Sequence, residues 1–415
     1  MTAYLRERVD AVFGLARPTR LGVAVSGGGD SVALLSVLVG YARDHGIALH
    51  VVCVDHGVRP EAKQEISFVA DLCRRWDLQH HVEYWTGWNG EGNFSAKARD
   101  ARYALMADWA CANDITHIAL GHTADDQAET FLMRLARGAG VDGLSGMASS
   151  RSSRGITWVR PFLTVERAAL RTFLRASGLD WCEDPSNENR DYERIKVRDA
   201  LTVLGTLGIT MDGLLNVAHN MTEAREALDW QTFQAARDLA TVRHGVIVMD
   251  KGRFDTHPKE IRRRLLVHTV RWISGNGYPP RGGTVTRTLE AIANGRTVTL
   301  DGCQVMSDGS QIWVFREYDA VRSLTSEIGE TWDVRWLVDC ADDDPDLQVR
   351  ALGFDALTSI DGWRSVGLPR AALASSPAVW CNGQLVAAPV ANPDKEWTAY
   401  LKDGDDAYFS ALLSH

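Results

Sequence analysis

The sequence has few of the features that mark secreted, membrane-bound or fibrous proteins. Its 415 residues include seven cysteines, which lie far apart and form no Cys-x-x-Cys motif, so neither a zinc ribbon nor a local dithiol pair is encoded. No apolar run approaches the roughly 20 residues that a membrane helix needs, and the first residues lack the apolar segment of a signal peptide. With 12 prolines and 36 glycines, the chain is neither collagen-like nor of low complexity. We therefore expect a reduced, cytoplasmic protein without a membrane partner.

The formal net charge of −9 hides an uneven distribution of charge along the chain. Residues 327–415 contain six Lys/Arg and 15 Asp/Glu, so this segment carries −9 and the rest sums to zero. Within that rest, residues 243–296 contain 11 Lys/Arg and four Asp/Glu, or +7. The total charge therefore does not exclude an anionic partner, although a solvated basic surface remains an alternative for the middle segment.

Residues 1–200 alternate short apolar runs with longer helical patterns. Strands are predicted at 21–25, 48–54 and 115–120, and helices at 32–45, 60–76 and 93–113. This alternation predicts an α/β fold with a parallel sheet that has helices on both faces. Ligands bind such sheets at the carboxyl ends of the strands, and all three runs end in glycine and polar residues.

Three domains are expected. Residues 1–205 form the α/β domain, residues 206–325 a mainly helical domain, and residues 326–415 a small mixed α+β domain. The Gly- and Ser-rich segment 138–154 predicts a mobile loop, and the four aspartates within 341–347 predict an acidic turn or linker. Helices are predicted at 211–240 and 258–274, and strand-like pieces at 297–300 and 311–315. The 14 tryptophans are scattered, so we expect them to serve core packing rather than base stacking.

The segment from Val23 to Leu35 is the most informative, because a buried strand enters a glycine-rich loop and an apolar helix follows directly. Its loop reads Ser26-Gly27-Gly28-Gly29-Asp30-Ser31. The glycines allow a sharp turn and a close approach of backbone N–H groups to a ligand, and the helix N-terminus adds partial positive charge. The loop therefore predicts a phosphate site, with a plain turn capped by Asp30 as the alternative. It is not a Walker A loop, because the Gly-Lys-Ser/Thr ending is absent.

Ser-Gly-Gly-x-Asp-Ser after a strand resembles the PP-loop of the N-type ATP pyrophosphatases. The resemblance implies an enzyme that splits ATP between its α and β phosphates and adenylates a carbonyl oxygen of the substrate. It also implies that residues 26–31 hold the pyrophosphate and that Asp30 helps to bind Mg²⁺.

Further segments resemble, as an ordered set, the tRNA(Ile)-lysidine synthetase family over about the first 200 residues. They are Val54-Asp-His-Gly-Val-Arg59, Asn93-Phe-Ser-Ala-Lys-Ala-Arg-Asp-Ala-Arg-Tyr103, Gly121-His-Thr-Ala-Asp-Asp-Gln-Ala-Glu-Thr130, Arg137 to Met147, Arg160-Pro-Phe-Leu and Trp181-Cys-Glu-Asp-Pro-Ser-Asn187. Two positions depart from the family pattern. Ile195 replaces the usual Asn between Arg194 and Arg198, and Thr123 stands where many members carry a second His.

The resemblance implies ATP-dependent ligation of L-lysine to C2 of the wobble cytidine, position 34, of a tRNA(Ile) with a CAU anticodon. ATP and Mg²⁺ would be required, and residues 326–415 would contact the tRNA acceptor stem. The oligomeric state is left open, a homodimer included. The implied catalytic residues are Asp30, His122, Asp125 and Asp126. The implied ATP-binding residues are Ser26, Gly27, Gly28, Gly29, Asp30, Ser31, Asp55, His56, Arg99 and Arg102. The implied tRNA-binding residues are Arg194, Arg198, Arg262, Arg263 and Arg264.

This chemistry makes two physical demands on the site. The O2 of cytosine is a poor leaving group, so ATP must activate it, and the phosphate charge must be stabilised. The lysine ε-amine has a reference pKa near 10.4, so its free base costs roughly 4.6 kcal/mol at pH 7 and needs a proton acceptor. Asp55, His122, Asp125 and Asp126 are the candidates. We also expect the wobble base to be flipped out of its stack.

Simpler structural roles and rival functions remain open at this point. Arg99 and Arg102 fit a solvated helix face, His56 and His122 fit strand ends, and Asp125 or Asp126 fits a helix cap. A tRNA thiolase would need cysteines that carry sulfur or hold a cluster. The other rivals are a GMP or NAD synthetase-like amidating enzyme and a non-catalytic RNA-binding module or nucleotide sensor.

Overall fold

The computed structural model describes residues 1–14, 16–57, 62–88, 94–183, 193–340, 346–393 and 396–413. The chain divides into two compact units, Met1–Arg225 and Glu226–His415. Their boundary falls within the long helix α9 (Met211–Leu239). The finer division of the chain at 205 and 325 stays a prediction.

The first unit is built on a six-stranded sheet with the order β3-β2-β1-β4-β6-β5. The strands are β1 (Arg20–Ala24), β2 (Ala48–Asp55), β3 (Gln79–Tyr84), β4 (His117–Leu120), β5 (Ser150–Ser153) and β6 (Ile156–Val159). All neighbouring strands are parallel except β5, which pairs antiparallel with β6. The predicted parallel sheet is thereby confirmed, and the strand order reverses direction at β1, the strand that leads into the glycine-rich loop.

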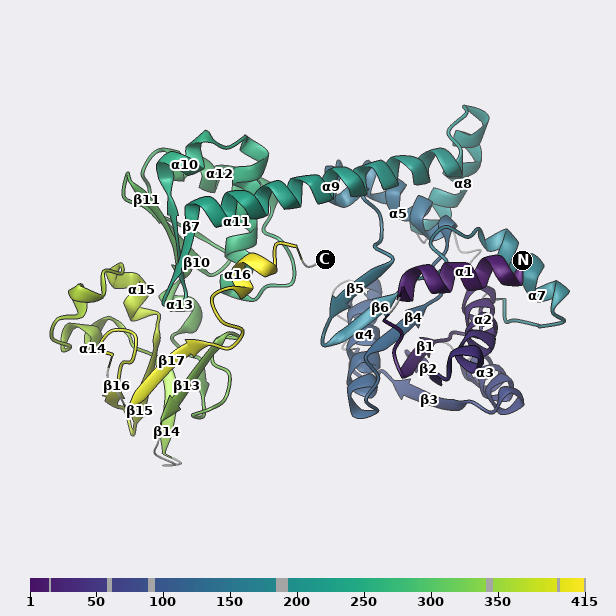
Figure 1. Cartoon of the computed structure of the whole chain (residues 1–415), viewed down its shortest axis with the longest axis horizontal. Helices are drawn as coiled ribbons and strands as arrows, with labels where there is room; N and C mark the ends of the chain where they lie inside the picture. The colour runs from purple at the N-terminus through teal and green to yellow at the C-terminus, as the bar shows by residue number, and fades with distance from the viewer. Residues whose placement is uncertain are drawn as a thin grey trace. The chain divides into compact units, whose positions relative to one another are not determined.

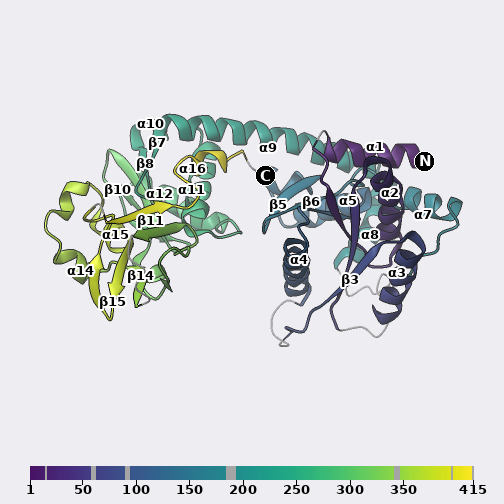
Figure 2. The same cartoon turned by 60° about the horizontal axis from the view of Figure 1, so that its bottom comes forward.

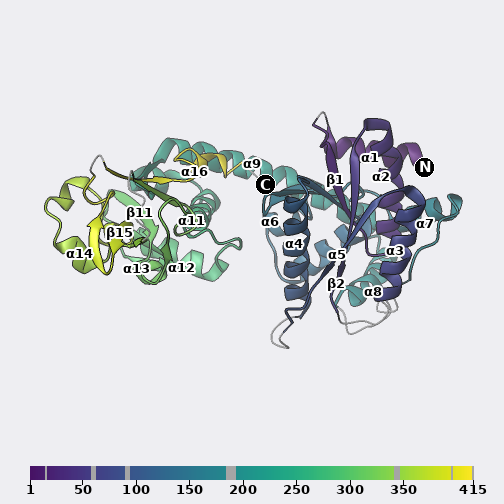
Figure 3. The same ribbon diagram turned by 90° about the horizontal axis from the view of Figure 1, so that it is seen from below.

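Helices cover both faces of this sheet, as the sequence predicts (Figures 1 and 2). Those of the first unit are α1 (Thr2–Phe13), α2 (Gly29–His45), α3 (Ala62–Trp76), α4 (Phe94–Ala112), α5 (Ala124–Ala136), α6 (Val141–Leu144), α7 (Arg167–Ala176), α8 (Glu193–Thr206) and the start of α9. One face carries α1, α2, α3 and α7, which bury Leu21, Val23 and Val51 of the sheet. The other face carries α4 (Figure 3), and Ala24 and Val52 of the sheet are buried there. Alternate residues of one strand therefore enter different cores, as a sheet covered on both faces requires.

No single helix among the described residues is long and apolar enough to cross a membrane. Helices α8 and α9 together reach that length and apolar composition, but they are bent by 104° relative to each other.

The prediction of a loop at 138–154 is wrong in part, because helix α6 and strand β5 lie within the segment. Strand β5 escaped prediction because it is an edge strand of serine and arginine without apolar alternation. Two segments with predicted features, 184–187 of the Asp-Pro-Ser-Asn motif and 341–345 of the acidic turn, lie outside the described residues.

The second unit combines helices with antiparallel sheets. A five-stranded sheet has the order β7-β8-β11-β10-β9, and the remaining strands form sheets β12-β14-β15-β16 and β13-β17. The strands are β7 (Ala240–Arg243), β8 (Val246–Asp250), β9 (Val298–Leu300), β10 (Cys303–Ser307), β11 (Gln311–Arg316), β12 (Thr325–Ser326), β13 (Trp336–Cys340), β14 (Leu347–Ala351), β15 (Pro377–Cys381), β16 (Gln384–Ala387) and β17 (Trp397–Leu401). The helices are α10 (Lys251–Thr256), α11 (Lys259–Ser274), α12 (Gly282–Ala293), α13 (Tyr318–Val321), α14 (Phe354–Thr358), η2 (Trp363–Val366), α15 (Arg370–Ala374) and α16 (Ala407–Ser410).

The five-stranded sheet separates two cores of the second unit. Ile247 and Met249 of β8 pack with α11, α12 and α16 on one face, whereas Val246 and Val248 join the core of the C-terminal sheets on the other. The fold class is confirmed: an α/β domain is followed by a region with long helices and by small mixed sheets. The middle region holds more strand than the predicted pieces at 297–300 and 311–315.

Candidate active site

The glycine-rich loop joins β1 to α2 at the carboxyl edge of the sheet. Helix α2 begins at Gly29, with Gly28 as its N-cap in an extended conformation. The Ser31 hydroxyl donates to the Gly28 carbonyl at 2.9 Å, and the Ser26 N–H donates to the same hydroxyl at 3.2 Å. Gly27 has a φ of +86°, which side-chain-bearing residues rarely adopt. The serines thus fix the loop, and glycine allows its turn, so the N-terminus of α2 stays open to a ligand.

The end of β4 lies directly against this loop. A Cβ on Gly121 would come within 3.1 Å of the Ser31 backbone N and Cα, so any larger residue would push the loop away by a few tenths of an ångström. The contact brings the residues that follow β4, His122 to Asp126, beside the residues that follow β1. The two segments meet at the point where the strand order reverses, which is where open α/β sheets bind ligands.

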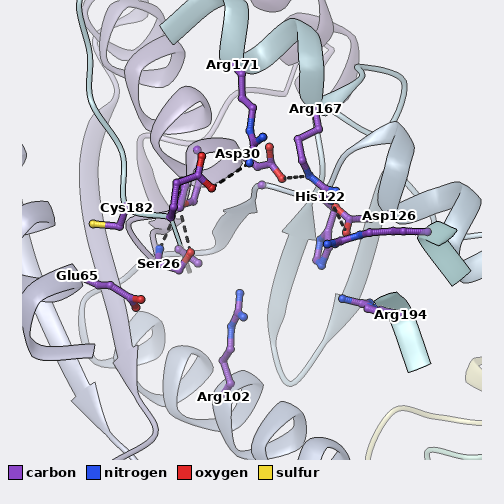
Figure 4. A pocket seen from close by; sticks show the side chains of 17 residues that line it. Ser26, Asp30, Glu65, Arg102, His122, Asp126, Arg167, Arg171, Cys182 and Arg194 are labelled. Atoms are coloured by element: carbon purple, nitrogen blue, oxygen red, sulfur yellow. Dashed lines mark hydrogen bonds and ion pairs between the residues drawn. The ribbon is translucent and has the colours of Figure 1, made fainter. Parts of the chain in front are cut away.

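A cavity of about 460 Å³ opens between these segments (Figure 4). The sequence-predicted residues that line it are Ser26, Gly28, Gly29, Asp30, Ser31, Arg102, His122, Asp126, Arg194 and Arg198. The other lining residues are Ala24, Glu65, Gly121, Arg167, Arg171, Cys182 and Glu183. Residues from β1, α2, α4, α5, α7 and α8 therefore converge on one site, and five arginines supply its positive charge.

Arg167, at the start of α7, is the centre of an ion-pair network in this cavity. Its Nε lies 2.9 Å from Oδ2 of Asp30, and its Nη2 lies 3.4 Å from Oδ1 of Asp126. Its Nη1 lies 3.7 Å from Oε1 of Glu129, which also binds Nε of Arg198 at 2.5 Å. One guanidinium thereby joins the loop of β1 to helix α5 and neutralises carboxylates that repel one another.

Burial and this network shift the acid–base properties of the site. Burial raises the pKa of Asp30, although Arg167 opposes the shift. Burial likewise raises the pKa of Glu129 against the pull of Arg198. Burial lowers the pKa of His122 to about 3, so its imidazole is neutral at pH 7. A neutral imidazole with so low a pKa is a hydrogen-bonding group rather than an efficient proton acceptor.

The neighbours Asp125 and Asp126 have different structural roles. Asp126 closes a capping box with Thr123 at the N-terminus of α5, where its Oδ2 accepts from the Thr123 N–H at 2.9 Å. Its other oxygen faces Arg167 in the cavity. Asp125 does not line the cavity, and its Oδ2 accepts from the Arg167 backbone N–H at 2.8 Å. Asp126 thus combines helix capping with a place in the site, and Asp125 holds the start of α7.

Some predicted ATP-binding residues lie outside the cavity lining. Asp55 is buried and accepts from the Gly57 N–H at 2.8 Å, which fixes the turn after β2. The His56 ring meets Trp85 edge to face at 5.8 Å. Arg99 is exposed and lies over the Tyr103 ring at 5.2 Å. Gly27 shapes the loop without lining the cavity. Their roles toward ATP remain predictions.

The predicted tRNA-binding arginines fall in two places. Arg194 and Arg198 project from α8 into the cavity. Between them Ile195 is buried on α8, which packs against α5, so an apolar side chain suits the position where the family usually has Asn. Arg262, Arg263 and Arg264 lie on α11 of the second unit. There Arg264 is buried, and its Nη1 binds Oδ1 of Asp229 at 2.7 Å, which gives it a structural role.

Arg167, Arg171 and Glu129 were not predicted as site residues. Glu129 follows Asp125 and Asp126 by four and three residues, and this spacing places them on one face of α5, so helical periodicity was a usable signal. Arg167 and Arg171 are also four residues apart on α7, but nothing in the sequence ties α7 to the loop of β1, 137 residues away.

The cavity fits a magnesium ion that is bound together with phosphates. Among the described residues, no group of three or more His, Cys, Asp or Glu could hold a metal by itself. Magnesium usually binds one or two carboxylates and completes its shell with phosphate oxygens and water. Asp30 meets this need, because its Oδ1 is buried without a hydrogen-bond partner and lies beside the loop that would hold the phosphates.

Comparison with known proteins agrees with this geometry. A family model described as a PP-loop domain matches residues 1–204. A tRNA(Ile)-lysidine synthase of Ruegeria pomeroyi is 48% identical over 405 residues, covering 98% of this chain and 96% of its own length. The chain belongs to the tRNA(Ile)-lysidine synthase family. It is an ATP-using ligase of the PP-loop type.

Other family members match a shorter part of the chain. The proteins of the same name from a Wolbachia of Brugia malayi and from Zymomonas mobilis are 32% and 36% identical, over 76% and 71% of this chain and 75% and 88% of their own lengths. A U34-tRNA thiolase structure from Methanococcus maripaludis has a TM-score of 0.47 at 15% identity, covering 53% of this chain and 78% of its own. That likeness carries no argument about function.

Proposed function

We propose that this protein ligates L-lysine to C2 of the wobble cytidine, position 34, of a tRNA(Ile) with a CAU anticodon. ATP first adenylates the O2 of that cytosine with release of diphosphate. The lysine ε-amine then attacks C2 and displaces AMP. The product, lysidine, pairs with A and changes decoding from AUG to AUA. The observation that carries the proposal is the cavity itself, in which the phosphate-binding loop and the carboxylate of Asp126 face each other.

The adenylation half of the reaction is supported by the loop end of the cavity. The N–H groups at the start of α2 and the arginines that line the cavity would stabilise charge on the phosphates. A magnesium ion held by Asp30 would neutralise the leaving diphosphate. Burial lowers the pKa of Arg102, because its charged form has lost contact with water. A phosphate anion that enters the cavity would stabilise that charged form.

The transfer half is supported by the acidic end. Asp126 lines this end with a carboxylate oxygen that pairs with Arg167 in the structure and that would suit a cationic lysine side chain. Of the four candidate proton acceptors, Asp55 is engaged in its turn, Asp125 holds α7, and His122 has a pKa of about 3. We assign the proton of the attacking amine to Asp126, because among these four candidates it alone lines the cavity and carries a negative charge that pairs with the ammonium group.

A tRNA thiolase is the second candidate, and the cysteines do not favour it. Cys53 is buried in the hydrophobic core as part of β2, and burial raises its pKa to about 12. Cys182 lines the cavity, but burial raises its pKa as well. Both shifts disfavour the thiolate that sulfur transfer requires.

A single assay separates these functions. We expect the purified protein to convert ATP to AMP only in the presence of a CAU-anticodon tRNA, and to incorporate labelled lysine into that tRNA. A tRNA with a C-to-U change at position 34 is the matched control, because it lacks the nucleobase that accepts lysine. Sulfur incorporation, or AMP formation with ammonia and no tRNA, would contradict the proposal.

The basic stretch of the second unit gives a further prediction. Changing Arg262 and Arg263 to glutamate should weaken tRNA binding more than ATP binding and reduce the salt dependence of the tRNA Kd, because phosphate contacts release counterions. Arg264 is left unchanged, since its reversal would disrupt the buried pair with Asp229. An unchanged tRNA Kd and salt slope would identify this stretch as a solvated surface.

A further inference from the structure

Three aromatic side chains gather at the carboxyl edge of the sheet, beyond β2 and β3. Trp85 directly follows β3, and its backbone N–H donates to the backbone carbonyl of Asp55 at 2.8 Å. Its ring lies 6.2 Å from Trp88 and 5.7 Å from Phe94, and the last two rings meet edge to face at 5.0 Å. Because Phe94 begins α4, the cluster links the end of one strand to the start of the next helix.

This cluster is separate from the hydrophobic cores of the described residues. None of Trp85, Trp88 and Phe94 belongs to a core or packs against one, and each of the three is half-buried. The five residues between Trp88 and Phe94 are glycine, asparagine and glutamate, so the segment adds no apolar side chain. Aromatic rings that are partly exposed and that no core uses are available to contact a ligand.

Cationic side chains follow the cluster along α4 toward the cavity. Nζ of Lys97 lies 5.5 Å from the Trp88 ring centroid. Arg99, two residues further along α4, is exposed, and Arg102, which shares a helix face with Arg99, lines the cavity. The eight residues from Phe94 to Arg102 span about 12 Å of helix. Flat aromatic rings beside cationic side chains match single-stranded nucleic acid, whose bases stack on the rings and whose phosphates meet the cations.

We infer that Trp85, Trp88 and Phe94 form a stacking surface for an unpaired nucleobase of the RNA substrate, next to the nucleotide that enters the cavity. The inference rests on the proposed function, because it takes the substrate to be an anticodon loop. It departs from the expectation that the tryptophans serve only core packing. The remaining tryptophans that belong to cores, such as Trp158 and Trp332, keep that role.

The test compares tRNA and ATP binding in variants of Trp88 in the full-length protein. Trp88→Ala should raise the Kd for a CAU-anticodon tRNA about tenfold, within the range measured for loss of one base–aromatic stack. Trp88→Phe, which keeps a ring, should recover most of that affinity. The Kd for ATP and the melting temperature should stay at wild-type values, because the residue lies outside the cores.

Each contrary result is distinguishable from failure of the proposed function. If the wild-type protein forms lysidine but Trp88→Ala and Phe94→Ala bind tRNA as tightly as wild type, the stacking surface is wrong and the function stands. If these variants lose affinity for ATP instead, the rings contact adenine and the inference is overturned. If the wild-type protein binds no tRNA, both the stacking surface and the proposed function are wrong.

Discussion

Replacing Asp30 by alanine is expected to reduce AMP formation by on the order of 10²- to 10³-fold, the scale at which loss of charge stabilisation acts in active sites. Asp30 stands at the N-terminus of α2 beside the phosphate-binding loop, and its unpartnered Oδ1 is the oxygen that fits a magnesium ion. Without it, the leaving diphosphate would lose the magnesium ion that we propose Asp30 to hold. The rate of tRNA-dependent AMP formation at saturating ATP and Mg²⁺ measures the effect.

Asp44→Ala is the matched control, because Asp44 lies on the same helix and also pairs with an arginine. Its Oδ2 is 2.6 Å from Nη1 of Arg6, far from the cavity lining and largely exposed, so activity should remain near the wild-type value. A native circular dichroism spectrum should accompany the loss in Asp30→Ala. Retained turnover in a folded Asp30→Ala protein would remove Asp30 from the reaction and leave it as a partner of Arg167.

The central part of the fold follows from local patterns in the sequence. The apolar runs that become β1, β2 and β4 are buried on both faces, so they stand out as continuous hydrophobic segments. Strands β3 and β5 lie at the two edges of the sheet, where polar side chains such as His81 and Arg151 are tolerated. Their sequences lack the apolar signal, and only pairing with a neighbouring strand makes them strands.

The candidate site was predictable where its residues lie close together in the sequence. Ser26 to Ser31 form one loop, and a helix N-terminus gives that loop its chemistry, so the motif alone indicates a phosphate site. The ion pair between Arg167 and Asp30 depends on how α7 packs against α2, which is a property of the tertiary structure. For the same reason, the different roles of Asp125 and Asp126 become visible only when α7 is in place.

Those different roles lead to a prediction about the two half-reactions. Asp126→Asn should slow lysine transfer far more than adenylation, so that adenylated tRNA accumulates. The asparagine Oδ1 can still accept from the Thr123 N–H, so the cap of α5 is kept while the charge that accepts the amine proton is lost. Single-turnover assays with labelled ATP and labelled lysine separate the two steps.

Raising the pH should partly rescue transfer in Asp126→Asn. The lysine ε-amine has a reference pKa near 10.4, so below that value each rise of one pH unit increases the free base about tenfold. An amine that is already deprotonated does not need the carboxylate to take that proton. Asp125→Asn is the matched control, because it makes the same chemical change one residue away at a side chain that accepts from the Arg167 backbone and does not line the cavity. It should lower the melting temperature without accumulation of adenylated tRNA. Equal loss of both half-reactions in Asp126→Asn, with no rescue by pH, would assign Asp126 to ATP or metal binding and leave the proton acceptor to another group.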